Sequence, residues 1–553
     1  MDAPNAPAAR HRARAERAEA WRRAGLWDAS TLWSRAAAHA AERPDALAVV
    51  DRDGARAHTY AAVVDAARAL AAHLRARGVE AGHVVSVQLP NQVEAVVAAL
   101  AVQALGAVLN PLLPGYRRHE LEHVFRVARP RAIVTPVTYR GFAYAPLVDE
   151  VRAATGVAAW HVAAAGLDGD DATVEAGDAS FARACAGAPA DAASLGGRAD
   201  ALSEVIFTSG TEAAPKAVLH TEETTNFSVR AAWSDMGLRD DDVVWMPSPV
   251  GHSTGFNYGL RMALYHGLPL VLQDRWSADV ALALVERFRC SYTLAATTFL
   301  QDLVEAARAL VPARPLASLR CFGCGGAPVP PDLVTAAREV GIDVRRLYGS
   351  TEVLVATWNR ADTSLARKRD TDGAPLAHVE VELRDEDGKR CAPGEPGEIF
   401  TRGPNTCVGF LDDPEREART ISDDGWVRSG DLATADAQGF VSIVGRRKDI
   451  VIRGGLNIAP REVEDLMLAF DEVERVAIVG VPDARLGERC CACVVLRAGA
   501  ELDLATAVER LRGVGLATHK LPERLERFDA LPTTASGKIQ KFRIQELLAE
   551  RAR

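Results

Sequence analysis

The fold class of this chain is decided by the stretch Thr208-Ser209-Gly210-Thr211-Glu212-Ala213-Ala214-Pro215-Lys216. It follows Ser203–Phe207, a short apolar run that predicts a β-strand. Glycine and small hydroxyl residues let backbone N–H groups converge on an anion, and a lysine adds a positive charge. The GxxxxGK[ST] order of a Walker loop is absent. By composition alone the stretch is a polar turn or a phosphate-binding loop, and the turn is the commoner structure.

Lysine is rare in this chain, because arginine supplies almost all of the 65 basic residues. The lysines are Lys216, Lys368, Lys389, Lys448, Lys520, Lys538 and Lys541. Where a lysine lies inside a motif, we therefore expect that the site needs its compact ammonium group, because the guanidinium of arginine cannot replace it.

Further polar segments follow the first stretch along the chain. They are Gly323-Cys324-Gly325-Gly326-Ala327-Pro328, Tyr348-Gly349-Ser350-Thr351-Glu352, Trp426-Val427-Arg428-Ser429-Gly430-Asp431, Gly445-Arg446-Arg447-Lys448-Asp449, Gly454-Gly455-Leu456-Asn457-Ile458 and Pro532-Thr533-Thr534-Ala535-Ser536-Gly537-Lys538. In this order the segments resemble the motifs of the adenylate-forming superfamily, which includes acyl-CoA synthetases, peptide-synthetase adenylation domains and luciferases. The TSGTExxPK form of the first stretch is similar to that of cyclohexanecarboxylate- and medium-chain acyl-CoA ligases. The resemblance runs from Leu89 to Lys538.

The resemblance implies a nucleotide site. Thr351 would contact the α-phosphate, and Glu352 would bind Mg²⁺, a hard cation that prefers carboxylate and phosphate oxygens. Asp431 would accept hydrogen bonds from the ribose hydroxyls, and Arg446 would help to hold the ribose. The implied nucleotide-binding residues are Thr208, Ser209, Gly210, Thr211, Lys216, Gly325, Gly326, Ala327, Tyr348, Gly349, Ser350, Asp431 and Arg446.

The resemblance also implies a mobile C-terminal domain. Lys448 would be the hinge, and Lys538 would reach the active site during adenylation, where developing negative charge needs a mobile cation. Gly454 and Gly455 would line the tunnel through which the pantetheine thiol arrives. Three of the seven lysines thus fall at the family's three lysine positions: Lys216, Lys448 and Lys538.

His252-Ser253-Thr254-Gly255-Phe256 resembles the HxxG segment beside the acyl pocket, which would place His252 near the substrate carboxylate. Amino-acid-activating relatives usually carry an aspartate here, and this stretch has none. We therefore expect a carboxylic acid without an α-amino group. The candidate pocket walls, which could equally be ordinary core, are Phe256, Tyr258, Phe299, Val353 and Trp358.

Three functions remain open at this point. The first is an acid–CoA ligase that uses ATP, Mg²⁺ and coenzyme A. The second is an adenylating enzyme with another acceptor, such as a carrier protein supplied in trans or an amine, or with an unusual oxyanion as its substrate. The third is a non-catalytic nucleotide-binding protein. The complete set of Lys216, Glu352, Asp431 and Lys538 argues against the third.

Composition sets broad limits on the class of protein. The chain has 553 residues, 48% hydrophobic and 25% charged, with a formal net charge of −9. An acidic balance argues against nucleic acid as the main partner. No apolar run approaches the ~20 residues of a membrane span, and no secretory signal begins the sequence. The 9 cysteines, an odd number, fit a reducing cytoplasm, and no metal other than that of the nucleotide is expected.

The pattern of elements predicts an α/β protein. Leu270–Leu272, a helix capped by Ser277, and Tyr292–Ala295 form a β-α-β unit, which favours a parallel sheet. Residues 164–200 lack periodicity and predict a solvated loop or insertion. We expect a large, multi-layer N-terminal domain over residues 1–447, for binding AMP and the acid. A small, mobile α+β domain is expected over 448–553.

Overall fold

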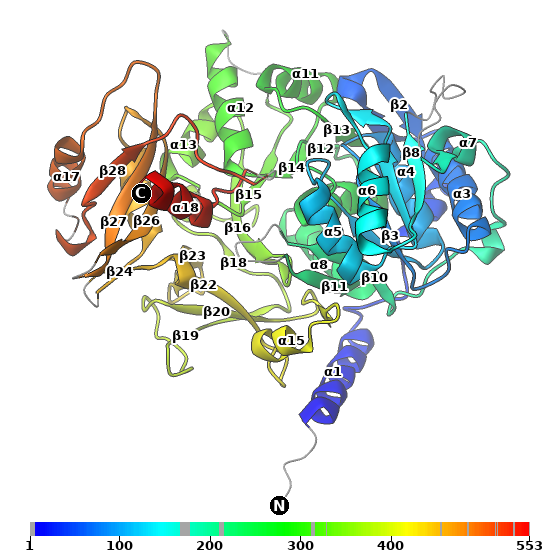
Figure 1. Cartoon of the computed structure of the whole chain (residues 1–553), viewed down its shortest axis with the longest axis horizontal. Helices are drawn as coiled ribbons and strands as arrows, with labels where there is room; N and C mark the ends of the chain where they lie inside the picture. Colours follow the sequence, from blue (N-terminus) through cyan, green and yellow to red (C-terminus); the bar gives the residue numbers. More distant parts are fainter. Residues whose placement is uncertain are drawn as a thin grey trace, which may run out of the picture.

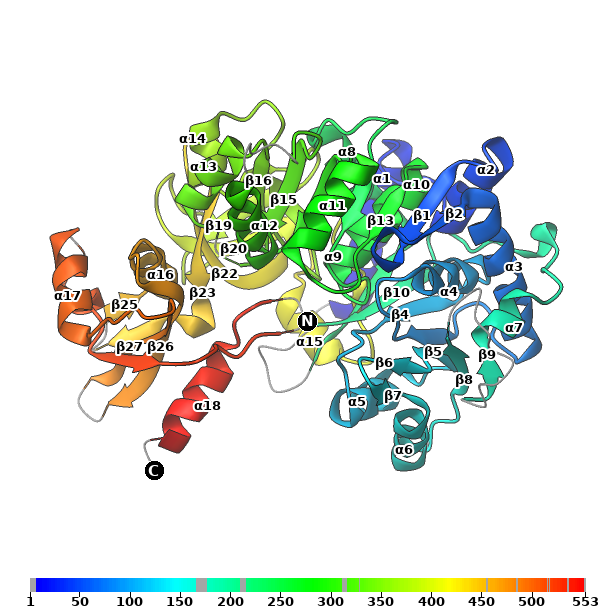
Figure 2. The same cartoon turned by 90° about the horizontal axis from the view of Figure 1, so that it is seen from above.

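The computed structural model describes residues 6–165, 177–208, 215–310, 316–327, 329–453, 456–483, 486–514, 516, 518–534 and 537–551. Its architecture is α/β, with a large N-terminal domain and a smaller C-terminal domain, as the sequence predicted (Figures 1 and 2). The boundary at 447/448 stays a prediction. Two large sheets, each with parallel strands at its centre, form the frame of the N-terminal domain.

Within the described residues the first sheet has nine strands, which are parallel from β16 to β1 and antiparallel at the edges. The predicted β-α-β unit is present as β13, α11 (Ala278–Phe288) and β14, and the Ser277 side chain caps α11 by accepting from the Val280 N–H. In spatial order the strands are β18 (Ala374–Pro375), β17 (Leu354–Trp358), β16 (Val344–Ser350), β15 (Cys321–Gly325), β14 (Tyr292–Ala295), β12 (Val244–Met246), β13 (Leu270–Leu272), β1 (Leu47–Asp51) and β2 (Arg56–Thr59).

The second sheet, over the ranges that the structure describes, has eight strands and includes the hairpin on either side of the Thr208–Lys216 stretch. Its strands are β21 (Gly409–Phe410), β11 (Ala217–Thr221), β10 (Leu202–Phe207), β4 (Val108–Pro111), β3 (Val84–Val87), β5 (Ala132–Pro136), β8 (Trp160–Ala164) and β9 (Ala179–Ser180). A short ribbon, β6 (Thr138–Tyr139) with β7 (Phe142–Ala143), lies apart from it. A third, antiparallel sheet contains β19 (Glu380–Arg384), β20 (Gly397–Arg402), β22 (Val427–Ala435) and β23 (Val441–Arg446).

Two helices lie between the large sheets. All residues of α4 (Val93–Ala104) are buried, and this helix contacts β3 and β4 on one side and β1 on the other. Apart from Glu94 and Gln103, its sequence is apolar around the circumference, which is typical of a helix enclosed by core. The helix α8 (Glu222–Asp235) contacts β11 and β17 in the same way.

Most of the other helices cover the outer faces or lie at the edges (Figures 1 and 2), but α9 (Ser253–Gly255) and α10 (Met262–His266) are largely buried. Those next to the first sheet include α12 and α13, while α6 packs on the second. The helices are α1 (Ala6–Arg23), α2 (Leu32–Glu42), α3 (Tyr60–Ala76), α5 (Arg118–Ala128), α6 (Ala145–Thr155), α7 (Phe181–Cys185), α9 (Ser253–Gly255), α10 (Met262–His266), α11 (Ala278–Phe288), α12 (Thr297–Ala309), α13 (Pro331–Glu339), α14 (Leu365–Asp370) and α15 (Pro414–Thr420).

The C-terminal part forms a separate α+β unit with its own core. Val463 and Met467 of one helix pack on one face of the sheet, and Ile544 and Leu548 of another pack on the opposite face. Its elements are β24 (Val451–Arg453), β25 (Leu456–Ile458), α16 (Pro460–Leu468), β26 (Val473–Asp483), β27 (Gly487–Leu496), α17 (Leu504–Gly513), β28 (Arg524–Arg527) and α18 (Lys541–Arg551).

The prediction of a solvated loop over 164–200 is wrong in part. The described residues of this segment include β9 and α7, and the Phe181 side chain is fully buried in the main core. Strand β9 pairs in parallel with β8. A two-residue strand and a five-residue helix are too short to produce a periodic signal, so the buried aromatic was the only local sign of packing.

A buried charge cluster ties the second sheet to the segment after His252. Arg261 lies at the end of η4 (Phe256–Arg261), a π-helix, and its guanidinium pairs with both Glu204 of β10 and Glu222 of α8. It also donates to Asn257 Oδ1 at 3.0 Å and to Asn226 Oδ1 at 2.8 Å. Buried arginine is stabilised only by such complete pairing, because desolvation of the lone charge is costly.

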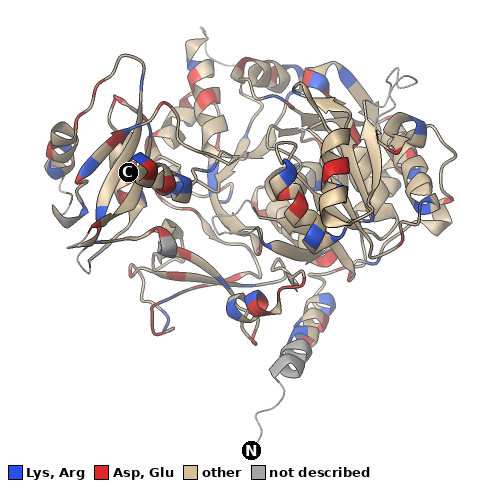
Figure 3. Cartoon of the chain, viewed as in Figure 1, with Lys and Arg blue, Asp and Glu red and all other residues tan. Residues whose placement is uncertain are grey.

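Charges of both signs are interspersed over the ribbon (Figure 3). Among the described residues, no helix is long and apolar enough to cross a membrane. The nine cysteines are all free thiols, and burial raises the pKa of Cys321 to about 11 and that of Cys324 to about 12.

Replacing Arg261 with Met should lower the free energy of unfolding by about 3–5 kcal/mol, because Glu204 and Glu222 would stay buried without their cation. The matched control is Arg308→Met, whose pair with Glu339 is exposed on both sides and should contribute little. Urea titration followed by circular dichroism compares the two. Equal stability of the Arg261 and Arg308 variants would contradict the role of the cluster.

Candidate active site

The described ends of the Thr208–Lys216 stretch are held together by backbone pairing. The Thr208 N–H donates to the Lys216 carbonyl at 2.9 Å, and the Lys216 N–H donates to Thr208 Oγ1 at 3.2 Å. These bonds continue the antiparallel hairpin of β10 and β11. We call residues 207–208 and 215–216 the loop neck. The predicted phosphate ligands Ser209, Gly210 and Thr211 lie outside the described residues.

The predicted adenine loop and the Tyr348–Glu352 motif emerge side by side. They lie at the carboxyl ends of β15 and β16, which are parallel neighbours with Gly325 opposite Leu347. Loops at the carboxyl ends of adjacent parallel strands are a common place for ligands. A Cβ on Gly349 would lie 1.9 Å from the Leu354 carbonyl oxygen, so only glycine fits where the chain turns back into β17. Gly325 ends β15 and is followed by Gly326 and Ala327, while Gly349 and Ser350 end β16.

Glu352, the predicted metal ligand, faces Lys216 at the end of the Thr208–Lys216 stretch. Lys216 Nζ lies 3.5 Å from Glu352 Oε1, and the carboxylate is only 12% exposed. The Glu352 carbonyl accepts from the Cys407 N–H at 2.7 Å, which fixes the backbone below it. A lysine from one sheet and an acid from the other thus meet where the resemblance places the phosphates.

The predicted ribose ligand Asp431 is held by two partners. Tyr348 donates its hydroxyl hydrogen to Asp431 Oδ2 at 2.8 Å, and Arg446 Nε lies 3.1 Å from Asp431 Oδ1. Asp431 and Arg446 are opposite each other in the β22–β23 ladder. Burial raises the pKa of Asp431 above its ordinary value, and Arg446 opposes that shift. The arrangement binds Tyr348, Asp431 and Arg446 into one unit.

Lys538 enters the site from the C-terminal domain. Its backbone closes a turn, donating to Thr534 Oγ1 at 3.1 Å and accepting from the Thr534 N–H at 2.7 Å. The end of its side chain lies against Gly326, since a Cβ placed there would be 3.1 Å from Lys538 Cε. Burial and the neighbouring Arg446 lower the pKa of Lys538, while Asp431 and Glu352 oppose the shift.

His252 caps α9 and faces the same region. Its Nδ1 accepts from the Thr254 N–H at 3.3 Å, and burial, with the charge of Lys538, lowers its pKa to about 3. The ring is therefore neutral at physiological pH, so it offers hydrogen bonds but no charge. A Cβ on Gly255 would lie 2.2 Å from the Pro249 carbonyl oxygen, so glycine is required for the tight turn after His252.

The candidate pocket walls are mostly enclosed by core. Phe256, Tyr258, Val353 and Trp358 are buried, and the Tyr258 hydroxyl is engaged by Ser228 Oγ at 2.6 Å and by the Val355 N–H at 2.8 Å. Phe299 packs edge-on against Trp276, with ring centroids 4.6 Å apart. These contacts are those of packed core side chains. The role of these residues as pocket walls stays a prediction.

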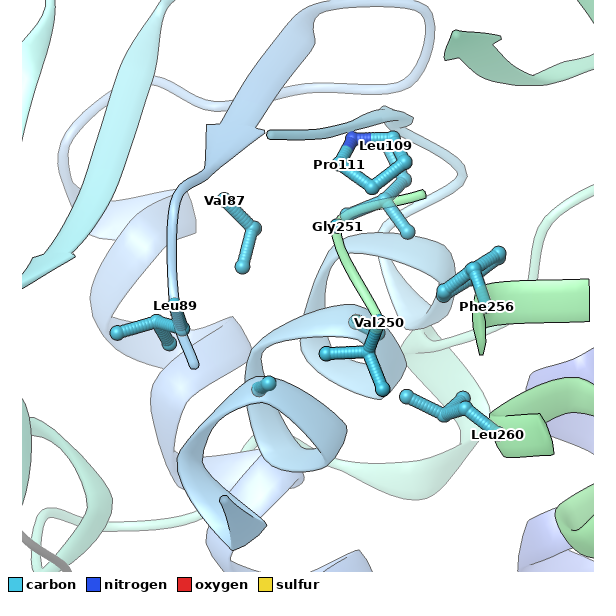
Figure 4. A pocket seen from close by; sticks show the side chains of 10 residues that line it. Val87, Leu89, Leu109, Pro111, Val250, Gly251, Phe256 and Leu260 are labelled. Carbon is cyan, nitrogen blue, oxygen red and sulfur yellow. The ribbon is translucent and has the colours of Figure 1, made fainter. Parts of the chain in front are cut away.

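A small apolar cavity lies behind the segment that carries His252. It has a volume of about 10 Å³ and is enclosed by β3, β4, α4 and the chain at Val250 and Gly251 (Figure 4). A cavity of that size holds at most one water, and its lining offers no side-chain polar partner for one. It is a packing gap rather than a site for an acid.

The predicted hinge and thiol tunnel are described only in part. Lys448 lies in a single 3₁₀ turn, η5 (Arg447–Asp449), between β23 and β24. Arg447 beside it pairs with Glu398 of β20 at 3.2 Å. Gly454 and Gly455 lie outside the described residues, and their roles stay predictions.

Sequence reasoning missed His220, which follows Lys216 in β11. The ring Nε2 lies 2.7 Å from the Thr351 carbonyl oxygen, and Nδ1 lies 3.0 Å from Thr224 Oγ1. A carbonyl only accepts, so Nε2 carries the hydrogen. His220, which lies in the β10–β11 hairpin, therefore fixes the backbone at Thr351. His220 and Val218 are two residues apart in the strand and lie on the same face, which indicated that His220 is buried but not which group it hydrogen-bonds.

Two family models match the chain, each in the region of one domain. "AMP-binding enzyme" covers residues 36–411, and "AMP-binding enzyme C-terminal domain" covers 462–538. The chain belongs to the AMP-binding enzyme family. It is an ATP-dependent acid–thiol ligase of the AMP-forming class, which confirms the class predicted from the motifs.

Three individual proteins show how close the relationship is. The chain is 36% identical to the medium-chain fatty-acid–CoA ligase of Escherichia coli (strain K12) over 97% of this chain and 94% of that protein. It is 32% identical to the salicyl-AMP ligase / salicyl-S-ArCP synthetase of Mycobacterium tuberculosis (strain ATCC 25618 / H37Rv), over 95% and 92%. ATP-bound MatB from Rhodopseudomonas palustris superposes with a TM-score of 0.85 at 28% identity, over 95% and 100%.

The buried His220 should make stability depend on pH. Burial lowers its pKa from 6.5 to about 4, so the unfolded chain binds a proton between these values that the folded protein does not. The contribution of neutral His220 to the free energy of unfolding is complete above pH 6.5. It is lost as the pH falls to about 4, at up to about 1.4 kcal/mol per pH unit. Urea unfolding of wild type and His220→Gln at pH 7.5, 5.5 and 4.5 should give a shallower decline in the variant. Parallel declines would show that His220 is protonated in the folded state.

Proposed function

We propose that this enzyme uses MgATP to activate a carboxylic acid without an α-amino group as its acyl-AMP, and then transfers the acyl group to coenzyme A. The observation that carries the proposal is the convergence of side chains from four distant segments. Lys216 lies beside Glu352, Asp431 is held by Tyr348 and Arg446, and Lys538 reaches the same place from the C-terminal domain.

In the first half-reaction, a carboxylate oxygen attacks the α-phosphorus of ATP and pyrophosphate leaves. Lys216 and the hydroxyl of Thr208 would bind the departing phosphates, and Asp431 would orient the ribose. Lys538 would neutralise negative charge as it forms on the carboxylate and the α-phosphate. His252, neutral at this pH, would donate a hydrogen bond to the acid.

The residues at Glu352 fit a magnesium ion that is held mainly by the nucleotide. Glu352 offers one partly buried carboxylate, and among the described residues no group of three His, Cys, Asp or Glu side chains could hold a metal by itself. One hard oxygen donor together with phosphate oxygens is the coordination that Mg²⁺ prefers. When bound, Mg²⁺ would neutralise charge on the polyphosphate.

In the second half-reaction, the thiol attacks the acyl carbon, and AMP leaves with the oxygen that came from the carboxylate. We propose that the C-terminal domain turns about Lys448 between the two steps, which removes Lys538 and brings Gly454 and Gly455 to the thiol path. Each face of the domain would then serve one step. We place the enzyme in the cytoplasm, which suits its nine free cysteines.

An acceptor other than coenzyme A is the second candidate. The name of one relative includes an S-linked ArCP product, so acceptors differ among proteins of this similarity. Acid-dependent ATP–pyrophosphate exchange over a panel of fatty, alicyclic and aryl acids tests the first step. Adding coenzyme A to the best acid tests the second. Exchange without thioester formation would favour a carrier protein or an amine, and absence of exchange with every acid would contradict the proposal.

Glu352→Gln should lower kcat for adenylation at least about a hundredfold, because it removes the negative charge that binds the metal. Pyrophosphate exchange measured against Mg²⁺ concentration is the readout. The control, Glu339→Gln, changes an exposed carboxylate in α13 and should leave exchange unchanged. Wild-type magnesium dependence in the Glu352 variant would show that the assignment is wrong.

Lys538→Ala should lose pyrophosphate exchange about a hundredfold or more and lose far less thioester formation from supplied acyl-AMP, since the charge that it neutralises has then already formed. Gly455→Trp should show the reverse pattern by blocking the thiol path. Lys389→Ala, in an exposed turn, is the control. Equal damage to both steps in each variant would contradict the division of labour between the two faces.

A further inference from the structure

His123 lies on α5, outside every motif that the sequence analysis identified. The helix begins with Glu120 accepting from the Arg117 N–H at 2.9 Å, and it packs against the second sheet through Leu121, Val124 and Phe125. His123 is half-buried between these anchors, so its ring is carried on a fixed helix rather than on a loop.

The His123 ring contacts both segments of the loop neck. It packs edge-on against Phe207, with centroids 5.8 Å apart and an interplanar angle of 86°. Its Nε2 lies 3.1 Å from the Pro215 carbonyl oxygen. Because a carbonyl only accepts, Nε2 carries the hydrogen in both the neutral and the charged ring. Proline cannot donate a backbone hydrogen bond, so its carbonyl is the one backbone polar group that Pro215 offers.

Through these two contacts His123 links Phe207, which precedes Thr208, with Pro215, which precedes Lys216. Thr208 and Lys216 are paired with each other across the neck, and Lys216 continues to Glu352 at 3.5 Å. A shift of Pro215 would therefore move the Lys216 ammonium away from Glu352. Small displacements of this kind reduce rates strongly when binding groups must meet a ligand in a fixed geometry.

We propose that His123 is a positioning residue that holds the loop neck and thereby sets the binding of the ATP polyphosphate. The ring edge fixes the β10 side, and the Nε2–H fixes the β11 side. The inference rests on the proposed function, because it assigns the stretch after Thr208 to the phosphates. It predicts an effect on ATP binding and adenylation but not on the thioester step, in which no polyphosphate takes part.

Two substitutions separate the two contacts. His123→Gln keeps an N–H donor at a similar reach and loses the ring, whereas His123→Phe keeps the ring and loses the donor. His119→Phe is the matched control, since His119 is exposed on the same helix. The measurements are the Kd of a non-hydrolysable ATP analogue by calorimetry, kcat/KM for ATP in pyrophosphate exchange, and thioester formation from supplied acyl-AMP.

We expect His123→Phe to weaken analogue binding and to lower kcat/KM for ATP about tenfold, with His123→Gln falling less and His119→Phe unchanged. Thioester formation from acyl-AMP should change less than about twofold in all three. Equal losses in both half-reactions, or unchanged ATP kinetics in both His123 variants, would overturn the inference. If wild type neither binds the analogue nor exchanges pyrophosphate, the proposed function itself fails. A normal wild type with unaffected variants refutes only the role of His123.

Discussion

The pairing of Arg261 with Glu204 and Glu222 is the constraint on which the geometry of the site depends. Glu204 lies in the strand that enters the phosphate stretch, and Glu222 begins the helix that follows it. Arg261 itself ends the π-helix that continues from His252. One buried guanidinium therefore holds the β10–β11 hairpin and the segment after His252 at a fixed separation. Because an unpaired buried charge would be strongly disfavoured, the ion pairs keep β10, α8 and η4 together.

The active site is assembled from this frame by contacts between the domains and between the sheets. Lys216 comes from the second sheet and Glu352 from the end of a strand in the first. Asp431 belongs to the third sheet, and its partner Tyr348 brings it to the same place. Lys538 completes the arrangement from the C-terminal domain. Such an arrangement suits a reaction in which the last cation must be present for one step and absent for the next.

Much of the fold could be predicted from local pattern. Alternating strands and helices gave the α/β class, and the β-α-β pattern from Leu270 to Ala295 gave two strands and one helix of the first sheet region. The motif residues were found because their order along the chain is distinctive. What could not be predicted depends on contacts between distant segments. His220, Arg261 and the Tyr348–Asp431 hydrogen bond join residues whose separation in the sequence carries no periodic signal. The buried Phe181 segment was missed because its elements are too short.

The most direct test of the account is the fate of the carboxylate oxygens. An acid labelled with ¹⁸O in its carboxyl group, turned over with ATP and coenzyme A, should deliver one labelled oxygen to the phosphate of AMP, as read by mass spectrometry. This follows because the attacking carboxylate oxygen stays on the α-phosphorus when the thiol takes the acyl group. Unlabelled AMP, or label in inorganic phosphate with ADP as the product, would contradict the formation of an acyl-AMP.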